Sequence, residues 1–187
     1  MPMSVPQRTA LLLGEPGRLP FLGHFRFCFD SGKVRFAGAG RVAARDDAEA
    51  AFEAARRIEH VLCSVEATSR GAGLHEMWSR LMRLPGAALG SKQGADLTVV
   101  LVAEDSGGIE ATAHGVGALW GIEAGQDEGV SLVHEGHPLL GEPGLAQEMC
   151  GTLSIDPRIE ALVAAPFGLV MGPPTRATIG VLCGVHA

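Results

Sequence analysis

The stretch from residue 94 to residue 122, GADLTVVLVAEDSGGIEATAHGVGALWGI, constrains the fold of this 187-residue chain more than any other. Leu97 to Ala103 is a nearly unbroken aliphatic run, which is typical of a strand covered on both faces. Asp105-Ser106-Gly107-Gly108 supplies the positive-φ residues that a tight turn needs. Ile109 to Val116 alternates apolar with polar or small residues, as a strand with one wet face does. The sequence therefore predicts a central β-hairpin.

Two amphipathic helices are predicted before this hairpin. Apolar residues recur at three- and four-residue spacing in both segments, which forms a stripe facing a core. Asp46 and Asp47 can cap the first helix, and Pro85-Gly86 ends the second. The two stripes consist of Phe52, Ala55, Ile58, Leu62 and Val65, and of Leu74, Met77, Trp78, Leu81 and Met82.

Short strands are predicted before the helices. They span Thr9 to Leu13, Phe21 to Phe29 and Val34 to Ala37, and we expect them to form a small β-meander. Phe25, Phe27 and Phe29 share one face of the second strand because side chains alternate along a strand. Gly38-Ala39-Gly40 is expected to be a flexible link to the first helix.

Behind the hairpin the sequence predicts shorter elements, in the order strand, helical turn, short helix and two closing strands. They are Val130 to Val133, Leu145 to Met149, Ile159 to Ala164, Phe167 to Met171 and Thr178 to Val185. Runs of strands separated from runs of helices indicate an α+β fold rather than a doubly wound parallel sheet. We expect a sandwich of antiparallel β-sheets flanked by α-helices.

Length and composition narrow the class of protein. A chain of this length fits a single globular domain over residues 1–187, and 47% hydrophobic residues argue against disorder. The net charge is −6 and no basic cluster exceeds Arg56-Arg57, which disfavours nucleic-acid binding. No apolar window reaches the roughly 18 residues of a membrane helix, so membrane insertion is not expected. The apolar run Ala10 to Leu13 is too short for a signal peptide, so we expect a cytoplasmic protein.

The richest polar cluster is His134-Glu135-Gly136-His137, with His114 on the preceding hairpin. Imidazole and carboxylate ligands suit zinc, iron or manganese. The helical zinc motif needs histidines four residues apart, whereas these two are three apart beside Gly136 and Pro138. A solvated loop is the preferred interpretation, and a metal site is the alternative.

Other catalytic motifs are absent from the sequence. Cys28, Cys63, Cys150 and Cys183 lack the paired spacing of a zinc site, and we expect reduced thiols. Ser31 and Ser64 lie outside any strand-to-helix nucleophile elbow. The glycines at 38–40 lack the spacing of a phosphate-binding loop. Trp78 and Trp120 are interpreted as core residues because their neighbours are apolar.

The order of elements resembles PPM-type (type-2C) protein phosphatases, including the branch that regulates sigma factors. The central LTVVLVAEDSGGIEATAHGVGALWGI is similar to the family's central hairpin in length, turn position and apolar pattern. The chain's TRATIGVLCGV is similar to the family's closing strand, and SLVHEGHPLLGEPG to a family loop. Together these segments cover about 100 residues, and they imply the PPM phosphatase fold.

The resemblance also implies which residues would hold metal. Family members bind two Mn²⁺ or Mg²⁺ ions through aspartates, and a metal-bound water attacks the phosphoryl group. Asp30 in FDSG would match the family's D-G signature. The family's V-G-D-S-R reads Val116 to Trp120 without a carboxylate, and its D-N reads Thr175-Arg176. One aspartate cannot hold two divalent ions, because each needs several oxygen ligands.

Three hypotheses follow. The leading one is a catalytically degenerate PPM-like domain, a pseudophosphatase without a cofactor that binds a protein partner as a regulatory or scaffold subunit. The second is an active metal-dependent phosphatase or hydrolase that holds Mn²⁺ or Mg²⁺ with Asp30, His114, Glu135 and His137. The third is a structural subunit of a larger assembly or homo-oligomer, which a mean hydropathy of +0.21 and a low charge content favour.

Overall fold

The computed structural model describes residues 9–12, 23–44, 48–84, 95–123, 130–135 and 152–166. In this part of the chain no helix is long and apolar enough to cross a membrane. The described elements follow one another in the order β1 (Thr9–Leu12), β2 (His24–Ser31), β3 (Val34–Ala44), α1 (Ala48–Leu62), α2 (Arg70–Arg83), β4 (Ala95–Asp105), β5 (Gly108–His114), β6 (Val116–Glu123), β7 (Val130–Glu135), β8 (Leu153–Ser154) and β9 (Ile159–Pro166).

The strands form two sheets. One has the order β2-β3-β4-β5-β8, and all of its neighbouring strands are antiparallel. The other has the order β1-β9-β6-β7, in which β1 and β9 are parallel and the remaining pairs are antiparallel. The described part of the chain therefore has an α+β fold of mixed, mainly antiparallel sheets with two helices. The parallel pair departs from the antiparallel expectation.

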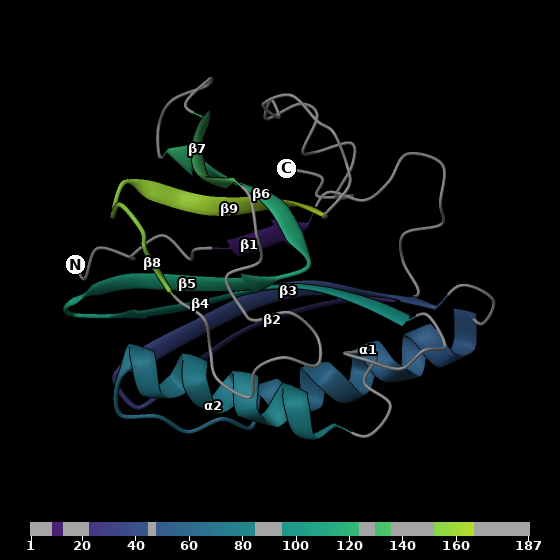
Figure 1. Cartoon of the computed structure of the whole chain (residues 1–187). Coiled ribbons are helices and arrows are strands. Elements are labelled where there is room, and N and C mark those ends of the chain that lie inside the picture. Colours follow the sequence, from purple (N-terminus) through teal and green to yellow (C-terminus); the bar gives the residue numbers. More distant parts are fainter. Residues whose placement is uncertain are drawn as a thin grey trace, which may run out of the picture.

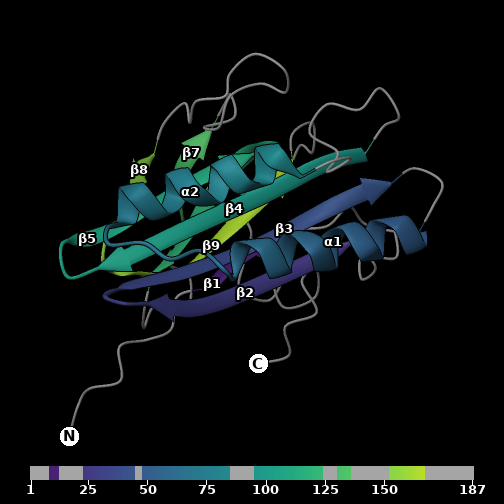
Figure 2. The ribbon, with the colours of Figure 1, turned by 90° about the horizontal axis from the view of Figure 1, so that it is seen from below.

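The elements are arranged in layers. Both described helices lie against the same face of the five-stranded sheet, and the four-stranded sheet lies across its other face (Figure 1). Seen from the helical side, α1 runs over β2 and β3, whereas α2 runs over β4 and β5 (Figure 2). The middle sheet is thus covered on both faces, which agrees with the continuous apolar run of β4.

The helix-covered face carries large side chains. The described side chains of the predicted apolar stripes point into this layer, and Ala55, Ile58 and Trp78 are almost fully buried in it. The side chain of Met82 lies outside the described part of the structure. Phe52 is the exception, because 46% of its surface is exposed and the Arg56 guanidinium lies 5.7 Å from its ring centroid. The second helix begins as a capped helix does, since the side chain of Ser69 accepts a hydrogen bond from the Ala72 amide.

The face between the two sheets carries alanines together with branched aliphatic side chains, and none of its described members is aromatic. Its members include Ala37, Ala39, Ala111 and Ala113 from the five-stranded sheet. The β5 strand is buried along most of its length, so the expectation of one wet face was wrong. The β5 strand lies between α2 and the four-stranded sheet. Its alternating residues therefore point to two faces that are both largely buried.

The glycine-rich segment after β2 is not the expected flexible link. Gly38, Ala39 and Gly40 lie within β3, opposite Phe27, Arg26 and Phe25 on β2. A Cβ atom at Gly38 would lie 2.4 Å from the Phe27 ring, and one at Gly40 would lie 2.1 Å from the Phe25 ring. Because Gly38 and Gly40 have no side chains, they leave the space into which these two rings pack.

Two further expectations were wrong. Ile159 to Ala164 forms strand β9 rather than a helix, because its short apolar run fits either state and pairing with β1 and β6 decides it. The strands of the first forty residues do not form one meander, because β1 belongs to the four-stranded sheet. The elements predicted at 145–149, 167–171 and 178–185, and the capping residues Asp46 and Asp47, lie outside the described residues.

Candidate functional site

Charged side chains gather at one end of the five-stranded sheet, which we call the turn end. It contains the β2–β3 turn, the β4–β5 turn and the connection between α1 and α2. The register places both turns at the same end, since Arg35 of β3 lies opposite Glu104 of β4. The helix connection lies there too, because the Ala67 amide donates to the Ser31 hydroxyl at 3.3 Å. Polar groups from three distant segments of the chain therefore meet at the turn end.

Arg70 links α2 to the β4–β5 hairpin at this end. Its Nη1 atom lies 2.7 Å from Oδ1 of Asp105, and its Nη2 atom lies 3.5 Å from Oε1 of Glu110. The same Asp105 oxygen accepts the Gly107 amide at 2.7 Å and so also closes the turn. The three side chains are only 21–25% exposed. The Arg70 guanidinium therefore forms ion pairs with two carboxylates and links α2 to the β4–β5 hairpin.

Arg80 makes a second set of contacts. Its Nε atom donates to Glu76 at 2.8 Å, and its Nη1 atom donates to the Ser64 hydroxyl at 2.6 Å. The hydrogen bond from Arg80 lowers the pKa of Glu76 below its usual range. Ser64 in turn donates to the Val61 carbonyl at 2.8 Å. The hydroxyl is thus held as a structural link and not beside a general base.

Ser64, Glu76 and Arg80 border an open hollow between the β2–β3 turn and the connection from α1 to α2. Cys63 lies on its wall, but burial, together with the charge of Glu59, raises the pKa of its thiol. A raised pKa disfavours the nucleophilic thiolate. The hollow is lined by Phe29, Asp30, Ser31, Gly32, Cys63, Ser64, Val65, Glu66, Ala67, Thr68, Ala72, Glu76 and Arg80.

Two of the four predicted metal ligands lie far apart. Asp30 is at the turn end, where it forms an ion pair of 2.9 Å with Arg35. His114 ends β5 at the other end of the same sheet, buried with its ring centroid 5.9 Å from that of Trp78. They are separated by five residues along the strands, about 17 Å, and by three strand spacings, about 14 Å. Asp30 and His114 therefore do not share one ion.

The other two predicted ligands belong to the four-stranded sheet or lie beyond it. Glu135 is the last residue of β7, and its backbone pairs with Ala118 of β6. His137 lies outside the described residues. Among the residues that the structure describes, no three His, Cys, Asp or Glu side chains come together as a metal site would require. The metal site stays a prediction that depends on the remaining residues.

The segment that resembles the family's V-G-D-S-R begins where the chain changes sheets. Gly115 joins β5 of one sheet to β6 of the other with a φ of +69°, and a Cβ there would lie 2.5 Å from the Leu97 carbonyl oxygen. Only glycine tolerates both conditions. The next residues run along β6 as Val116, Gly117 and Ala118. A carboxylate in the family's position would have been carried by residue 118.

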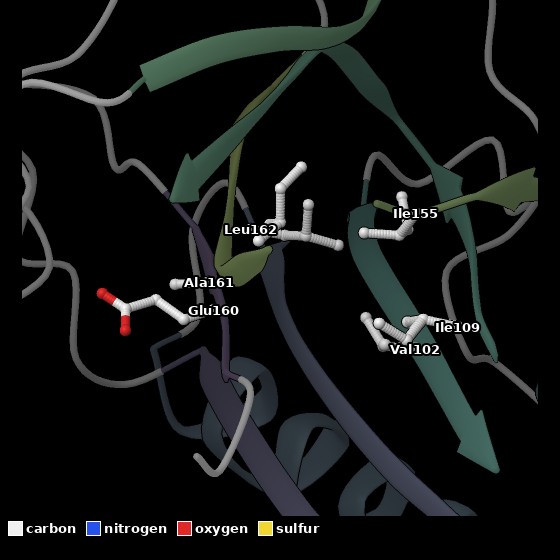
Figure 3. A pocket seen from close by; sticks show the side chains of 7 residues that line it. Val102, Ile109, Ile155, Glu160, Ala161 and Leu162 are labelled. Carbon is white, nitrogen blue, oxygen red and sulfur yellow. The ribbon is translucent and has the colours of Figure 1, made fainter. Parts of the chain in front are cut away.

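A second opening lies between the two sheets, close to β5, β8 and β9. It encloses about 220 Å³, part of it open to solvent, which is smaller than the roughly 300 Å³ or more of ligand pockets. Figure 3 shows apolar side chains around it, with the carboxylate of Glu160 pointing away from them. This opening is a gap in the packing and offers no polar anchor for a ligand.

Most of the turn-end contacts could not be read from the sequence. Glu76 and Arg80 are four residues apart on a predicted helix, and this spacing is a signal of an ion pair. Arg70 and Asp105 are separated by 35 positions in the sequence, on a helix and a hairpin. Only the folded structure brings them together.

No known protein-family profile and no curated protein sequence matches this chain. The solved structures that are similar to it include two bacterial phosphatases. A serine/threonine phosphatase from S. agalactiae is 14% identical and matches 67% of this chain and 54% of its own, with a TM-score of 0.49. A bacterial serine phosphatase with a point mutation is 9% identical and matches 79% of this chain and 65% of its own, with a TM-score of 0.41.

The chain thus spans less than two thirds of the length of either phosphatase. The similarity to these two bacterial phosphatases is distant.

Proposed function

We propose that this chain is a single PPM-like domain that has lost phosphatase chemistry and binds a protein partner as a regulatory or scaffold subunit. The observation that carries this is the β5–β6 crossover, where Gly117 and Ala118 stand in place of the family's Gly-Asp.

The charges at the turn end support a binding role over a catalytic one. Phosphoryl transfer needs cationic groups or metal ions free to stabilise the charge of the transferred group. Arg70 and Arg80 are instead engaged by carboxylates of the chain itself, at 2.7–3.5 Å. Removing either arginine from its carboxylates to serve a substrate would expose uncompensated negative charge.

The hollow at the turn end suits a protein segment better than a small substrate. It is open, and its wall combines the apolar Phe29 and Val65 with the polar Ser64 and Thr68. Ligand pockets bury most of a small molecule, whereas protein partners bind open surfaces of mixed polarity. The net charge of −6 disfavours nucleic acid as the partner.

Calorimetric titration of Mn²⁺ into the purified full-length chain tests the loss of the metal site. We expect no saturable binding up to millimolar Mn²⁺, and the same result for the matched variant Asp30→Asn. Saturable binding of two ions that weakens in Asp30→Asn would contradict the proposal, because it would restore the ligand set that the family uses.

A second candidate, a metal-dependent phosphatase with substituted ligands, is favoured by one observation. Glu135 pairs with Ala118 across β6 and β7, so a carboxylate residue neighbours the position at which the family carries aspartate. This candidate predicts that Glu135→Gln abolishes Mn²⁺ binding, whereas Glu123→Gln on the same sheet leaves it unchanged. Equal titrations of both variants and the wild type would exclude it.

A further inference from the structure

Three side chains that can carry positive charge lie together on one face of β2 and β3, away from the β2–β3 turn. Phe25 packs in the helix-covered layer, so His24 and Arg26 on either side of it point to the opposite face. The register places His24 opposite Arg41 and Arg26 opposite Ala39. Ala39 belongs to the layer between the sheets, and Arg41, two residues further along β3, points to the same side. His24, Arg26 and Arg41 are therefore neighbours, and we call them the cationic face.

The cationic face differs from other charged parts of the structure in its lack of carboxylates. In the described part of the chain, no ion pair joins His24, Arg26 or Arg41 to an acidic side chain. The neighbours of Arg41 on the facing strand are instead His24 and, diagonally, Arg26. Like charges at such positions are unfavourable. The cationic face therefore attracts a negatively charged group. Arginines with carboxylate partners elsewhere are Arg35, Arg56, Arg70, Arg80 and Arg158.

Two nitrogen atoms of the cationic face are buried, and no described residue accepts or donates a hydrogen bond there. They are Nε2 of His24 and Nε of Arg41. Native proteins rarely leave a buried polar atom without a partner, because the loss of its hydrogen bond to water is then uncompensated. Burial and, second, the positive charge of Arg41 lower the pKa of His24 below its ordinary value of 6.5. The oxygen atoms of an anion would satisfy both nitrogens.

The cationic face can be reached from the margin of the sheet. Figure 2 shows β2 along this margin, beside β3. On the same side of the sheet, β1 contacts β3 and β4. Arg26 is nevertheless exposed, and the side chains of His24 and Arg41 are only half-buried. A group carried by another molecule therefore has access to all three side chains.

We propose that the cationic face binds carboxylates of an acidic segment of a partner protein. The Arg41 guanidinium has the planar set of donors that matches a carboxylate, and His24 adds a donor beside it. Arg26 engages a second carboxylate nearer to solvent. The inference rests on the proposed function, because it names the chemistry of the protein partner. A net charge of −6 repels acidic segments from the surface as a whole, so attraction is confined to this face.

Other anions match the cationic face less well. Nucleic acid requires a longer row of cations to follow its phosphates, whereas this face has two arginines. A small free anion engages one guanidinium at a time. Because Arg26 and Arg41 stand on different strands, a segment that offers several carboxylates uses both. The acidic protein segment is therefore the favoured occupant.

Fluorescence polarisation of a labelled hexaglutamate peptide, titrated with the full-length chain at low salt, tests the proposal. We expect saturable binding that weakens as salt is added, and no binding of a matched hexaglutamine peptide. Arg41→Gln and Arg26→Gln should each weaken binding about tenfold, because each removes a charged donor. Arg57→Gln, at an exposed position of α1, is the control of equal charge and should bind like the wild type. Equal affinities of all four proteins, or equal binding of the two peptides, would overturn the proposal.

NMR of the histidine rings locates the contact independently of the arginine variants. The acidic peptide should shift the ring signals of His24, which are assigned by their loss in His24→Asn, and should raise the pKa of this ring. Unchanged His24 signals during saturable binding would place the peptide elsewhere and contradict the proposal. Circular dichroism of each variant verifies that the fold is retained.

Inorganic phosphate distinguishes a partner segment from a free anion. At the concentration of the peptide, phosphate should not displace it, because only the peptide engages both arginines. Displacement would make the cationic face a site for a small anion and would overturn the assignment to a protein.

The outcome is separable from the test of the proposed function, because these titrations contain neither Mn²⁺ nor a phosphate ester. Phosphatase turnover together with peptide binding would overturn only the loss of catalysis. Absence of peptide binding in a chain without turnover would overturn only this inference.

Discussion

The two faces of the five-stranded sheet are packed by different kinds of residue. The layer under the helices contains Phe25, Phe27, Phe36 and Trp78 among its buried members. The layer between the sheets contains five buried alanines, and none of its described members is aromatic. Both layers belong to the same strands, because successive residues of a strand point to opposite faces.

This difference shows how one strand meets two different requirements. Helices approach a sheet with a rounded surface, and large rings fill the space that the helix leaves. Two sheets approach as flatter surfaces, and small side chains let their backbones lie close together. The helix-covered layer should therefore be sensitive to loss of volume, and the layer between the sheets to gain of volume.

Removing the largest ring from the helix-covered layer should have the greatest effect. Trp78 is 1% exposed, and Trp78→Ala should lower the free energy of unfolding by about 3–5 kcal/mol because it leaves a cavity. Urea unfolding followed by circular dichroism measures this change. Trp78→Phe, which keeps a ring, should cost clearly less. Equal losses in the two variants would show that volume in this layer is not what matters.

Adding volume between the sheets should have the next largest effect. Ala111 is fully buried there, and Ala111→Leu should cost about 1–3 kcal/mol of unfolding free energy through overpacking. The matched control is Ala72→Leu on the exposed side of α2, which should change stability little. An Ala111→Leu variant as stable as the wild type would mean that the two sheets can move apart. It would contradict the proposed sensitivity of this layer to added volume.

The ion pairs at the turn end should contribute less than either packed layer. Arg70→Gln removes the links from α2 to Asp105 and Glu110, and should cost about 1 kcal/mol because these groups are only partly buried. Arg83→Gln, at the exposed end of the same helix, should cost less. Denaturant midpoints compared at low and high salt measure both. A loss as large as that of Trp78→Ala would show that charge and not packing fixes α2.

The smallest effect concerns an exposed pair next to β9. Hydrogen bonds from the Arg158 side chain and backbone lower the pKa of Asp156 to about 2. Because the folded pKa is depressed, the interaction is present above the ordinary value of 3.8 and is lost as pH falls toward 2. In Arg158→Gln the pKa should rise part of the way to 3.8, as measured by NMR titration of the carboxyl group. An unchanged pKa would assign the shift to the backbone amide alone.

The sequence predicted the elements whose signals are local. The central hairpin follows from an apolar run and a four-residue turn, and the two helices follow from residue spacing. Ile159 to Ala164 was mistaken for a helix because only its neighbours β1 and β6 make it a strand. Gly38 and Gly40 were mistaken for a link because their role depends on rings of β2.

The contacts of the candidate site also differ in whether a local sequence signal predicts them. Glu76 and Arg80 are close in sequence, and their spacing suggests the contact. Arg70 meets Asp105 only because α2 packs over the hairpin, and no local pattern encodes that. Asp30 was proposed as a metal ligand from the family resemblance and His114 from its residue type, and the register of the five-stranded sheet separates them.

Turnover of a generic phosphate ester by the purified full-length chain at millimolar Mn²⁺ tests the central claim most directly. We predict no release of phosphate above the rate of the buffer with Mn²⁺ alone, and no change when the ion is chelated. Turnover that requires Mn²⁺ and disappears with a chelator would contradict the proposal and would identify the chain as a working phosphatase.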